Sequence, residues 1–482
     1  MSASHHTTAQ SIDMQLATHV ATVQYADLPA HTVERIATFV ADTLSVGMAG
    51  SSVPQARQLL NTLAATESRE TRETGQTREN TGTVPIWGTR QTQTAPNAIL
   101  ANAFNVHCQE FDCVHEGAVV HAMATLLPVL MAEAQKRHER DRPVSGSELI
   151  AAVAVGIDAA STLGLSAKNA MRFFRPATAG GFGAAAGLAR LRGFDAAKVL
   201  AAWGFQLAQT SGTMQGHREG RPVLPLQVSF NARAAWQSCE LAQSGIASLA
   251  APISGECGYL PMFEGEHDIE PLMQTLGKVW RIDEFSHKPY PSGRATHAGI
   301  EGLLALIQTH QLKPEQIESV VVRGPSLISR LVNRPAQPEP GPNYARLCMP
   351  YVLAKVMQHG QLLPTHYGAQ ELADPQTFEL AQRVHMQVDD NPDPNAFTPV
   401  TVTVRLTSGE SHQTWLEHML ASPQRPLTRQ QCRDKFDQCC ALAIHPPVQP
   451  PNQPPNQPPD LYERIMDLAS LTDVSTLVHT TH

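Results

Sequence analysis

The stretch HCQEFDCVHEGAVVH, residues 107–121, concentrates side chains that can bind a metal ion or transfer protons. Its soft ligands are two thiols and three imidazoles: Cys108, Cys113, His107, His115 and His121. Structural zinc sites usually draw on close pairs such as C-x2-C, with a second pair at a set distance, and neither is present here. The pattern therefore does not favour a metal site, and we predict none.

Acid–base chemistry fits the same stretch better because of where His121 stands. Gly117 marks a probable break, and His121 opens an Ala-rich segment that reads as a helix. A helix N-terminus presents free N–H groups and a partial positive charge, which suit a substrate carboxylate. An imidazole there can exchange a proton near neutral pH, with Glu110 and Asp112 close by to orient it. The competing interpretation is a core or capping histidine.

Helical patterns must position these residues in the first half of the chain. Residues 14–48 have apolar positions at helical spacing and break near 27–29, which predicts a helical hairpin. Three long Ala-rich segments then read as packed helices: 96–107, 121–137 and 147–165. The Gly-rich run GGFGAAAG follows no strand and lacks the G-x-G-x-x-G spacing, so it indicates close helix packing rather than a nucleotide loop.

The pattern changes after Trp280. Three β-branched runs predict strands, at 317–324, 383–389 and 398–406, among helical stretches at 294–310 and 347–359. Helical patterns return at 428–444 and 460–479. We therefore predict a mainly α fold, in which residues 1–272 and 413–482 build one all-helical domain and residues 273–412 form an inserted α+β lid. Residues 446–460 repeat Pro-Pro-Asn-Gln and predict a polyproline II linker.

Composition excludes several classes of protein. The 482 residues are 42% hydrophobic and 17% charged, with a formal net charge of −8, so a nucleic acid is not an expected partner. The N-terminus lacks the features of a secretory signal, and no uninterrupted apolar run predicts a membrane span. Eight scattered cysteines fit a reducing compartment, and we expect a cytoplasmic protein.

Several runs of this sequence resemble the MmgE/PrpD family. The resemblance covers most of the chain, in the right order: LPAHTVERIATFVADTLSVGMAGS, ANAFNVHCQEFDCVHEGAVVHAMATLLPVLMAEA, RFFRPATAGGFGAAAGLARLRG, LPLQVSFNARAA, GYLPMFEG, HKPYPSGRATHAGIEG and ARLCMPYVLAKVMQHGQL. It implies a helical domain built from both chain ends, an α+β lid, a homodimer, and catalysis without metal or organic cofactor.

The resemblance also implies a set of site residues. The acidic pair of the E-F-D run is Glu110 and Asp112, the histidine before the next helix is His121, and the lysine of the K-x-[FY]-P segment is Lys288. Glu110 stands where the family pattern has an aspartate, and two further positions depart from that pattern. Phe174 stands where family dehydratases and decarboxylases have a histidine, and Leu224 where they have a lysine.

Other side chains are candidates for binding substrate carboxylates. Arginines close to the two departures can supply the missing positive charge through forked donors. The candidates are Arg175, Arg218, Arg221, His115 and Tyr290, with Arg294 and Arg346 as further possibilities. Exposed salt bridges are the competing interpretation of the arginines.

The predicted function is a lyase, a dehydratase of the 2-methylcitrate dehydratase kind, that acts on a small di- or tricarboxylate. Such a reaction builds charge on a carbon next to a carboxylate, which requires a proton-transfer group and fixed cations or N–H donors. An epimerase of the iminodisuccinate kind and a decarboxylase of the cis-aconitate kind remain alternatives. A non-catalytic binding protein on the same fold is the alternative from another class.

Overall fold

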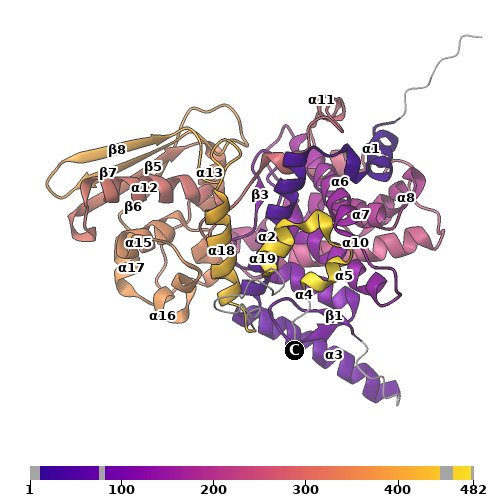
Figure 1. Cartoon of the computed structure of the whole chain (residues 1–482). Helices are drawn as coiled ribbons and strands as arrows, with labels where there is room; N and C mark the ends of the chain where they lie inside the picture. The colour runs from indigo at the N-terminus through magenta and orange to yellow at the C-terminus, as the bar shows by residue number, and fades with distance from the viewer. Residues whose placement is uncertain (1–10, 75–81, 446–459, 479–482) are drawn as a thin grey trace, which may run out of the picture.

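The computed structural model describes residues 11–74, 82–445 and 460–478, and its helices confirm the prediction of a mainly helical chain (Figure 1). The helices of the first half are α1 Ile12–Thr22, α2 Ala30–Gly50, α3 Pro54–Thr74, α4 Ala95–His107, α5 Ala122–His138, α6 Gly146–Leu165, α7 Arg175–Leu191, α8 Ala196–Gln209, α9 Gln215–Glu219 and α10 Val223–Gln243. The later helices are α11 Glu270–Met273, α12 His297–His310, α13 Ser326–Val332, α14 Pro342–Arg346, α15 Met349–His359, α16 Ala369–Leu372, α17 Pro375–Ala381, α18 Arg429–Ala441 and α19 Leu461–Met466.

Strands are short and few among the described residues. They are β1 Val84–Pro85, β2 Thr92–Gln93, β3 Val114–His115, β4 Phe285–Ser286, β5 Ile317–Gly324, β6 Val384–Val388, β7 Val400–Leu406 and β8 Ser411–Leu416. The last four form one sheet in the order β6-β5-β7-β8, in which β5 and β6 are parallel and the other neighbours antiparallel. Two further sheets pair β1 with β2 and β3 with β4.

A first buried cluster, the helical core, contains side chains from both ends of the chain. Most come from α1, α2, α4 to α8 and α10, and Phe436 of α18 and Tyr462 of α19 join them. Both late helices pack against α2. In Figure 1 α19 lies among the N-terminal helices, on the side of the molecule away from the four-stranded sheet.

Close backbone contact explains the glycines of α7. A Cβ added at Gly183 would lie 2.5 Å from the carbonyl oxygen of Gly156 in α6, so only glycine lets the two helices approach this closely. The Gly-rich run is thus part of helix packing, as its sequence predicts. A capping box of Ser145 and Glu148 starts α6.

A second buried cluster, the mixed core, joins the four-stranded sheet to α12, α13, α15 and α17. The predicted strands at 317–324, 383–389 and 398–406 correspond to β5, β6 and β7. Strand β8 lies outside the prediction because its residues, SHQTWL, are mostly polar, and only Leu416 among them is buried. Strand β8 ends at Leu416, beyond the predicted end of the lid at residue 412. The domain boundaries at 272 and 412 remain predictions.

The C-terminal pattern at 460–479 folds as a shorter helix than expected. Helix α19 ends at Met466, and two 3₁₀ turns, Leu468–Ser470 and Val474–Leu477, follow it. The predicted polyproline linker falls almost wholly on residues 446–459, outside the described residues.

Helix α6 has the length and composition of a membrane span, as does α2 taken together with residues 54–65 across an 80° bend. In α6, 89% of the most apolar window is buried inside the protein. Packing against α7 and the rest of the helical core therefore accounts for its apolar sequence.

Truncating Phe436 to alanine tests whether α18 belongs to the helical core. The ring is 1% exposed and lies 5.2 Å, centroid to centroid, from the ring of Tyr462. We expect Phe436→Ala to lower the free energy of unfolding by about 3–5 kcal/mol in chemical denaturation. The control Trp415→Ala removes a ring that is 58% exposed and should cost less than about 0.5 kcal/mol. If both substitutions lower the free energy of unfolding by the same small amount, the assignment of Phe436 to the helical core is wrong.

Candidate active site

The loop between α4 and α5 carries most of the predicted site. His107 is the last residue of α4, and His121 is the N-cap of α5. Glu110 and Val119 both have positive φ angles, 51° and 53°, which non-glycine residues adopt at a cost in free energy. Such strain persists only where the surroundings hold it, and it is common at functional sites.

Two long-range contacts hold this loop in place. Strand β3 pairs with β4, with Val114 opposite Ser286, and this brings Lys288 from far along the chain to the loop. From the other side, Lys435 of α18 donates to the carbonyl oxygen of Phe111 at 2.8 Å and pairs with Asp42 of α2 at 2.6 Å. The site is therefore assembled from the middle and both ends of the chain.

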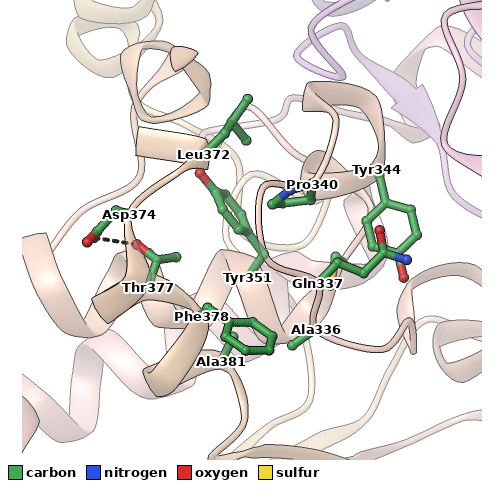
Figure 2. A pocket seen from close by; sticks show the side chains of 11 residues that line it. Ala336, Gln337, Pro340, Tyr344, Tyr351, Leu372, Asp374, Thr377, Phe378 and Ala381 are labelled. Carbon is green, nitrogen blue, oxygen red and sulfur yellow. Dashed lines mark hydrogen bonds between the residues drawn. The ribbon is translucent and has the colours of Figure 1, made fainter. Parts of the chain in front are cut away.

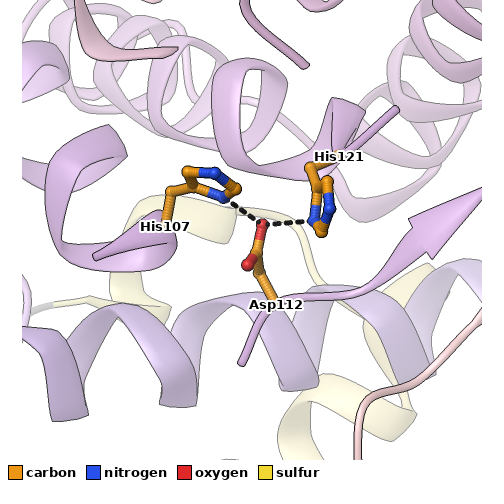
Figure 3. Close-up of side chains that lie close together, drawn as sticks. All are labelled: His107, Asp112 and His121. Carbon is orange, nitrogen blue, oxygen red and sulfur yellow. Dashed lines mark hydrogen bonds and ion pairs between the residues drawn. The ribbon is translucent and has the colours of Figure 1, made fainter. Parts of the chain in front are cut away.

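Asp112 lies at the centre of the site and is completely buried. Its Oδ2 accepts from Nδ1 of His107 and from Nδ1 of His121, each at 3.0 Å (Figure 3). The two imidazole rings stand edge to face, 4.9 Å apart. One carboxylate oxygen thus fixes both rings.

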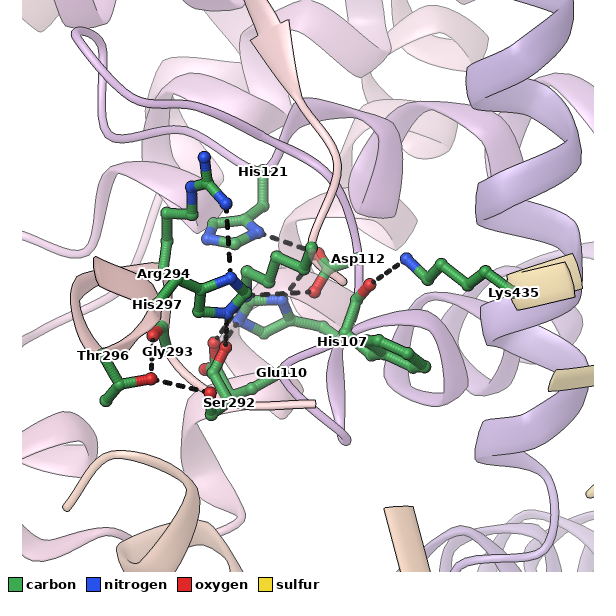
Figure 4. A network of polar contacts seen from close by, with 12 residues as sticks. His107, Glu110, Asp112, His121, Ser292, Gly293, Arg294, Thr296, His297 and Lys435 are labelled. Carbon is green, nitrogen blue, oxygen red and sulfur yellow. Dashed lines mark hydrogen bonds and ion pairs between the residues drawn. The ribbon is translucent and has the colours of Figure 1, made fainter. Parts of the chain in front are cut away.

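Lys288 and Glu110 form a second buried pair beside Asp112. Nζ of Lys288 donates to Oε2 of Glu110 at 3.0 Å and lies 3.9 Å from Oδ1 of Asp112. Oε1 of Glu110 lies 3.8 Å from Nε2 of His107. Figure 4 shows Glu110, Asp112 and the two histidines in one polar network. All four residues predicted as catalytic are therefore brought together.

The charges in this network move the pKa values apart. Burial raises the pKa of both carboxyl groups, but the positive neighbours Lys288, His107 and His121 outweigh it, so the pKa of Glu110 falls to about 2 and that of Asp112 falls well below its usual range. Both carboxylates are ionised at neutral pH.

The two histidines shift in opposite directions. Burial lowers the pKa of His107, but the Asp112 charge, its hydrogen bond and Glu110 outweigh burial, and the net pKa is raised. For His121 burial dominates and Lys288 and His107 add to it, so its pKa is lowered. Because an ionised Asp112 can only accept, the neutral His121 carries its proton on Nδ1 and its lone pair on Nε2.

A pocket opens over these groups, between residues of the helical core and of the mixed core. Its empty volume is about 490 Å³, including the space open to solvent. The polar residues that line it are His107, Glu110, His121, His217 and Arg294. Lys288 does not line the pocket, because its buried ammonium is bonded to Glu110.

The structure does not bring the five predicted substrate-binding residues to the pocket lining. Arg175 points away and pairs with the buried Glu264 at 2.8 Å. His115 uses both ring nitrogens, on Glu284 at 2.9 Å and on the N–H of Ala118. Arg218 and Arg221 are exposed at the surface. Tyr290 is partly buried and packs on the mixed core.

The pocket contains three polar residues that the sequence did not single out as its main candidates. His107 belonged to the opening stretch but was weighed only as a metal ligand. His217 stands in the same GHREGRP run as the two surface arginines, one residue before Arg218. Arg294 is the third, and its Nε pairs with Glu116 at 2.7 Å.

Arg294 and His217 differ in what they can offer a ligand. Nη2 of Arg294 is buried and has no hydrogen-bond partner among the described residues, so a carboxylate oxygen could satisfy it. Burial and the neighbouring Arg334 lower the pKa of His217 to about 4. His217 is therefore a neutral hydrogen-bonding group at neutral pH.

The departures Phe174 and Leu224 lie in different surroundings. Phe174 lines the pocket, with its ring centroid 5.8 Å from that of His107. Leu224 is buried in the helical core and is not among the lining residues. Only the first departure changes the chemistry of the pocket wall.

A second pocket, shown in Figure 2, lies wholly within the mixed part of the chain. It is mostly apolar, with Tyr351, Leu372 and Phe378 in its wall. Its one carboxylate, Asp374, accepts from Thr377 at 2.7 Å, and no histidine lines it. This pocket holds no acid–base pair.

His107, Asp112 and His121 are also close enough together to hold a metal ion. The contacts among these three residues are hydrogen bonds, in which the Nδ1 atoms of both histidines share one carboxylate oxygen of Asp112. The Lys288 ammonium, 3.9 Å from the other oxygen of Asp112, opposes a second cation there. The donor set therefore fits a proton-transfer network better than a metal site.

Removing the charge of Glu110 tests the buried pair. Glu110→Gln leaves the Lys288 ammonium buried with a weaker partner, so we expect a loss of about 3–5 kcal/mol in the free energy of unfolding at pH 7. Because the folded pKa lies below the ordinary value of 4.5, this stabilisation is complete above pH 4.5 and is lost as the pH falls toward about 2.

The same pH dependence supplies the control measurement. Glu110→Gln should flatten the fall in stability between pH 4.5 and about 2. Glu318→Gln removes an exposed pair with Arg405 and should cost less than about 1 kcal/mol, without changing the acid limb. An unchanged acid limb in Glu110→Gln would show that the pair does not control it.

Comparison with known proteins gives a consistent assignment. Residues 14–272 match the MmgE/PrpD N-terminal domain and residues 290–448 match the MmgE/PrpD C-terminal domain. A cis-aconitate decarboxylase-like protein of Aspergillus oryzae is 23% identical over 472 residues, which is 92% of this chain and 93% of that protein. A cis-aconitate decarboxylase of Aspergillus terreus is 22% identical over 288 residues, 58% of this chain and 56% of that protein. Together these matches extend over most of the chain, which therefore belongs to the MmgE/PrpD family.

Proposed function

We propose that this chain is a lyase that removes water from a small carboxylate by acid–base catalysis, with its own side chains as the only catalytic groups. The observation that carries the proposal is the pair of histidines on one carboxylate. Asp112 holds His121, whose pKa is lowered, and His107, whose pKa is raised, side by side at the pocket. Dehydration needs one base and one acid, and the site offers one of each.

The steps follow from the protonation states. Nε2 of His121 takes the proton from the carbon next to a substrate carboxylate. The electron pair of that C–H bond forms the C=C bond, the C–O bond breaks, and the leaving hydroxyl takes a proton from His107 to depart as water. We assign that proton to His107 Nε2, which is buried and has no hydrogen-bond partner among the described residues.

Charge develops on the substrate carboxylate during proton removal, and we assign its stabilisation to two features near the pocket. Nη2 of Arg294, a residue of the pocket lining, is a buried donor without a hydrogen-bond partner among the described residues. The first N–H groups of α5, directly after His121, add the positive end of a 17-residue helix. Lys288 acts through Glu110 and Asp112 as a positioning residue.

Decarboxylation is the second candidate, because the two similar fungal proteins are a cis-aconitate decarboxylase and a cis-aconitate decarboxylase-like protein. In that reaction the C–C bond to a carboxylate breaks, carbon dioxide leaves, and the carbanion takes a proton from His107. His121 would then have no proton to remove.

The cytoplasmic location and the homodimer expected from the sequence are part of the same proposal.

Proton NMR in D₂O tests the reaction, with 2-methylcitrate, citrate, cis-aconitate and iminodisuccinate as substrates. Dehydration gives new olefinic signals, decarboxylation gives loss of carbon dioxide, and exchange of the C–H proton without net conversion indicates an epimerase. His121→Gln should lower kcat/KM by about 10²–10⁴ if water is removed. Dialysis against EDTA should leave the rate unchanged.

A matched control is available for this variant. His19 makes the same kind of pair, with Asp158 at 2.9 Å, but does not line the pocket. His19→Gln should therefore keep kcat/KM within a few-fold of the parent. Full activity of His121→Gln toward a dehydrated substrate would contradict the assigned base.

The pH dependence of kcat/KM separates the two reactions. In dehydration His121 must be unprotonated and His107 protonated, so the profile should be bell-shaped, with one limb below 6.5 and one above it. In decarboxylation only the upper limb, from His107, should remain. Asp112→Asn removes the charge that raises the pKa of His107 and should move the upper limb to lower pH. An upper limb that does not move would exclude His107 as the acid.

A further inference from the structure

Much of the pocket lining consists of apolar side chains from both cores. We call six of them the apolar wall: Val119, Met171, Phe174, Leu331, Val332 and Phe397. Val119 is two residues before His121 and is held at φ 53°. The wall therefore begins directly beside the catalytic histidines.

Phe174 brings the wall to the reacting groups. Its ring centroid lies 5.8 Å from that of His107, and it is the N-cap of α7, so the helix fixes its position. A ring at this place gives a substrate carboxylate neither charge nor hydrogen bond. It does give contact area to a hydrocarbon group attached near the reacting carbon.

Three positive side chains near the pocket are committed to protein carboxylates. Lys288 is bonded to Glu110, Arg294 to Glu116 and Arg175 to Glu264. Among the described residues that line the pocket, Arg294 alone offers a guanidinium, through its unpartnered Nη2. Several free carboxylates would meet more apolar surface than positive charge here.

We propose that the substrate carries an apolar alkyl substituent longer than methyl next to its carboxylates, and that the apolar wall binds this substituent. The proposal rests on the proposed function for the identity of the reacting carboxylate. Its binding part depends only on the pocket and is measured separately.

Alkylsuccinates test the binding part because they have no hydroxyl to lose. The series is succinate, 2-methylsuccinate, 2-butylsuccinate and 2-hexylsuccinate, with Kd measured by isothermal titration calorimetry on the full chain. Each methylene buried against the wall should tighten Kd by about fourfold until the wall is covered. A flat or weakening series, or no binding by any member at millimolar concentration, would overturn the proposal.

Variants locate the effect at the wall. Phe174→His should remove most of the gain in affinity that the butyl and hexyl groups give over succinate. Phe173→His is the matched control, because Phe173 packs on Phe263 and does not line the pocket. Leu331→Ser, at a partly buried residue of the mixed part, gives a second test if the first variant does not fold. A chain-length gain that survives in both wall variants would contradict the assignment.

Turnover of 2-methylcitrate and 2-butylcitrate separates this proposal from the proposed function. A higher kcat/KM for the butyl compound supports both. Turnover confined to unsubstituted or methyl compounds overturns the apolar substituent and leaves the lyase in place. A rising alkylsuccinate series without turnover of any citrate supports the wall and counts against the lyase.

Discussion

The burial of the Asp112 carboxylate is the constraint on which the rest of the site depends. A completely buried carboxylate is costly unless charged and hydrogen-bonding partners surround it. Here two imidazoles share one of its oxygens and an ammonium approaches the other. These partners come from the end of α4, the start of α5 and the segment after β4, so satisfying one charge fixes how three distant segments meet. The contact of Lys435 with Phe111 adds the C-terminal helix to the same assembly.

The two histidines differ in pKa although they bond to the same oxygen. His107 lies between two carboxylates, because Glu110 approaches its other nitrogen at 3.8 Å. His121 lacks that second carboxylate, and the positive charges of Lys288 and His107 act on it with burial. Small differences in surroundings therefore shift the two pKa values in opposite directions, which is how carboxylate pairs are separated in other acid–base sites. Because the protonation of each histidine affects the other through Asp112, the two limbs of a pH profile give pKa values of the pair and not of either histidine alone.

Local patterns predicted much of this fold, and long-range contacts decided the rest. The hairpin, the Ala-rich helices and the strands β5 to β7 follow from periodicity, whereas β8 has a polar sequence and exists through its pairing with β7. Glu110, Asp112, His121 and Lys288 were placed together by resemblance, and the pairing of β3 with β4 is the physical reason. Arg175 was misplaced because a sequence does not reveal that Glu264 is its partner. His217 was passed over for two neighbouring arginines that turn out to be exposed.

The balance of charge in the pocket links the catalytic groups to the choice of substrate. A cation that pairs with a buried carboxylate of the protein is no longer available to bind a substrate carboxylate. The bond of Lys288 to Glu110 illustrates this. Glu116 and backbone carbonyls satisfy Nε and Nη1 of Arg294, and its buried Nη2 has no hydrogen-bond partner among the described residues. With Phe174 in the wall in place of a basic side chain, binding energy must come from apolar contact as well as from charge. The same buried network that sets an acid beside a base thus limits the negative charge that the pocket can accept.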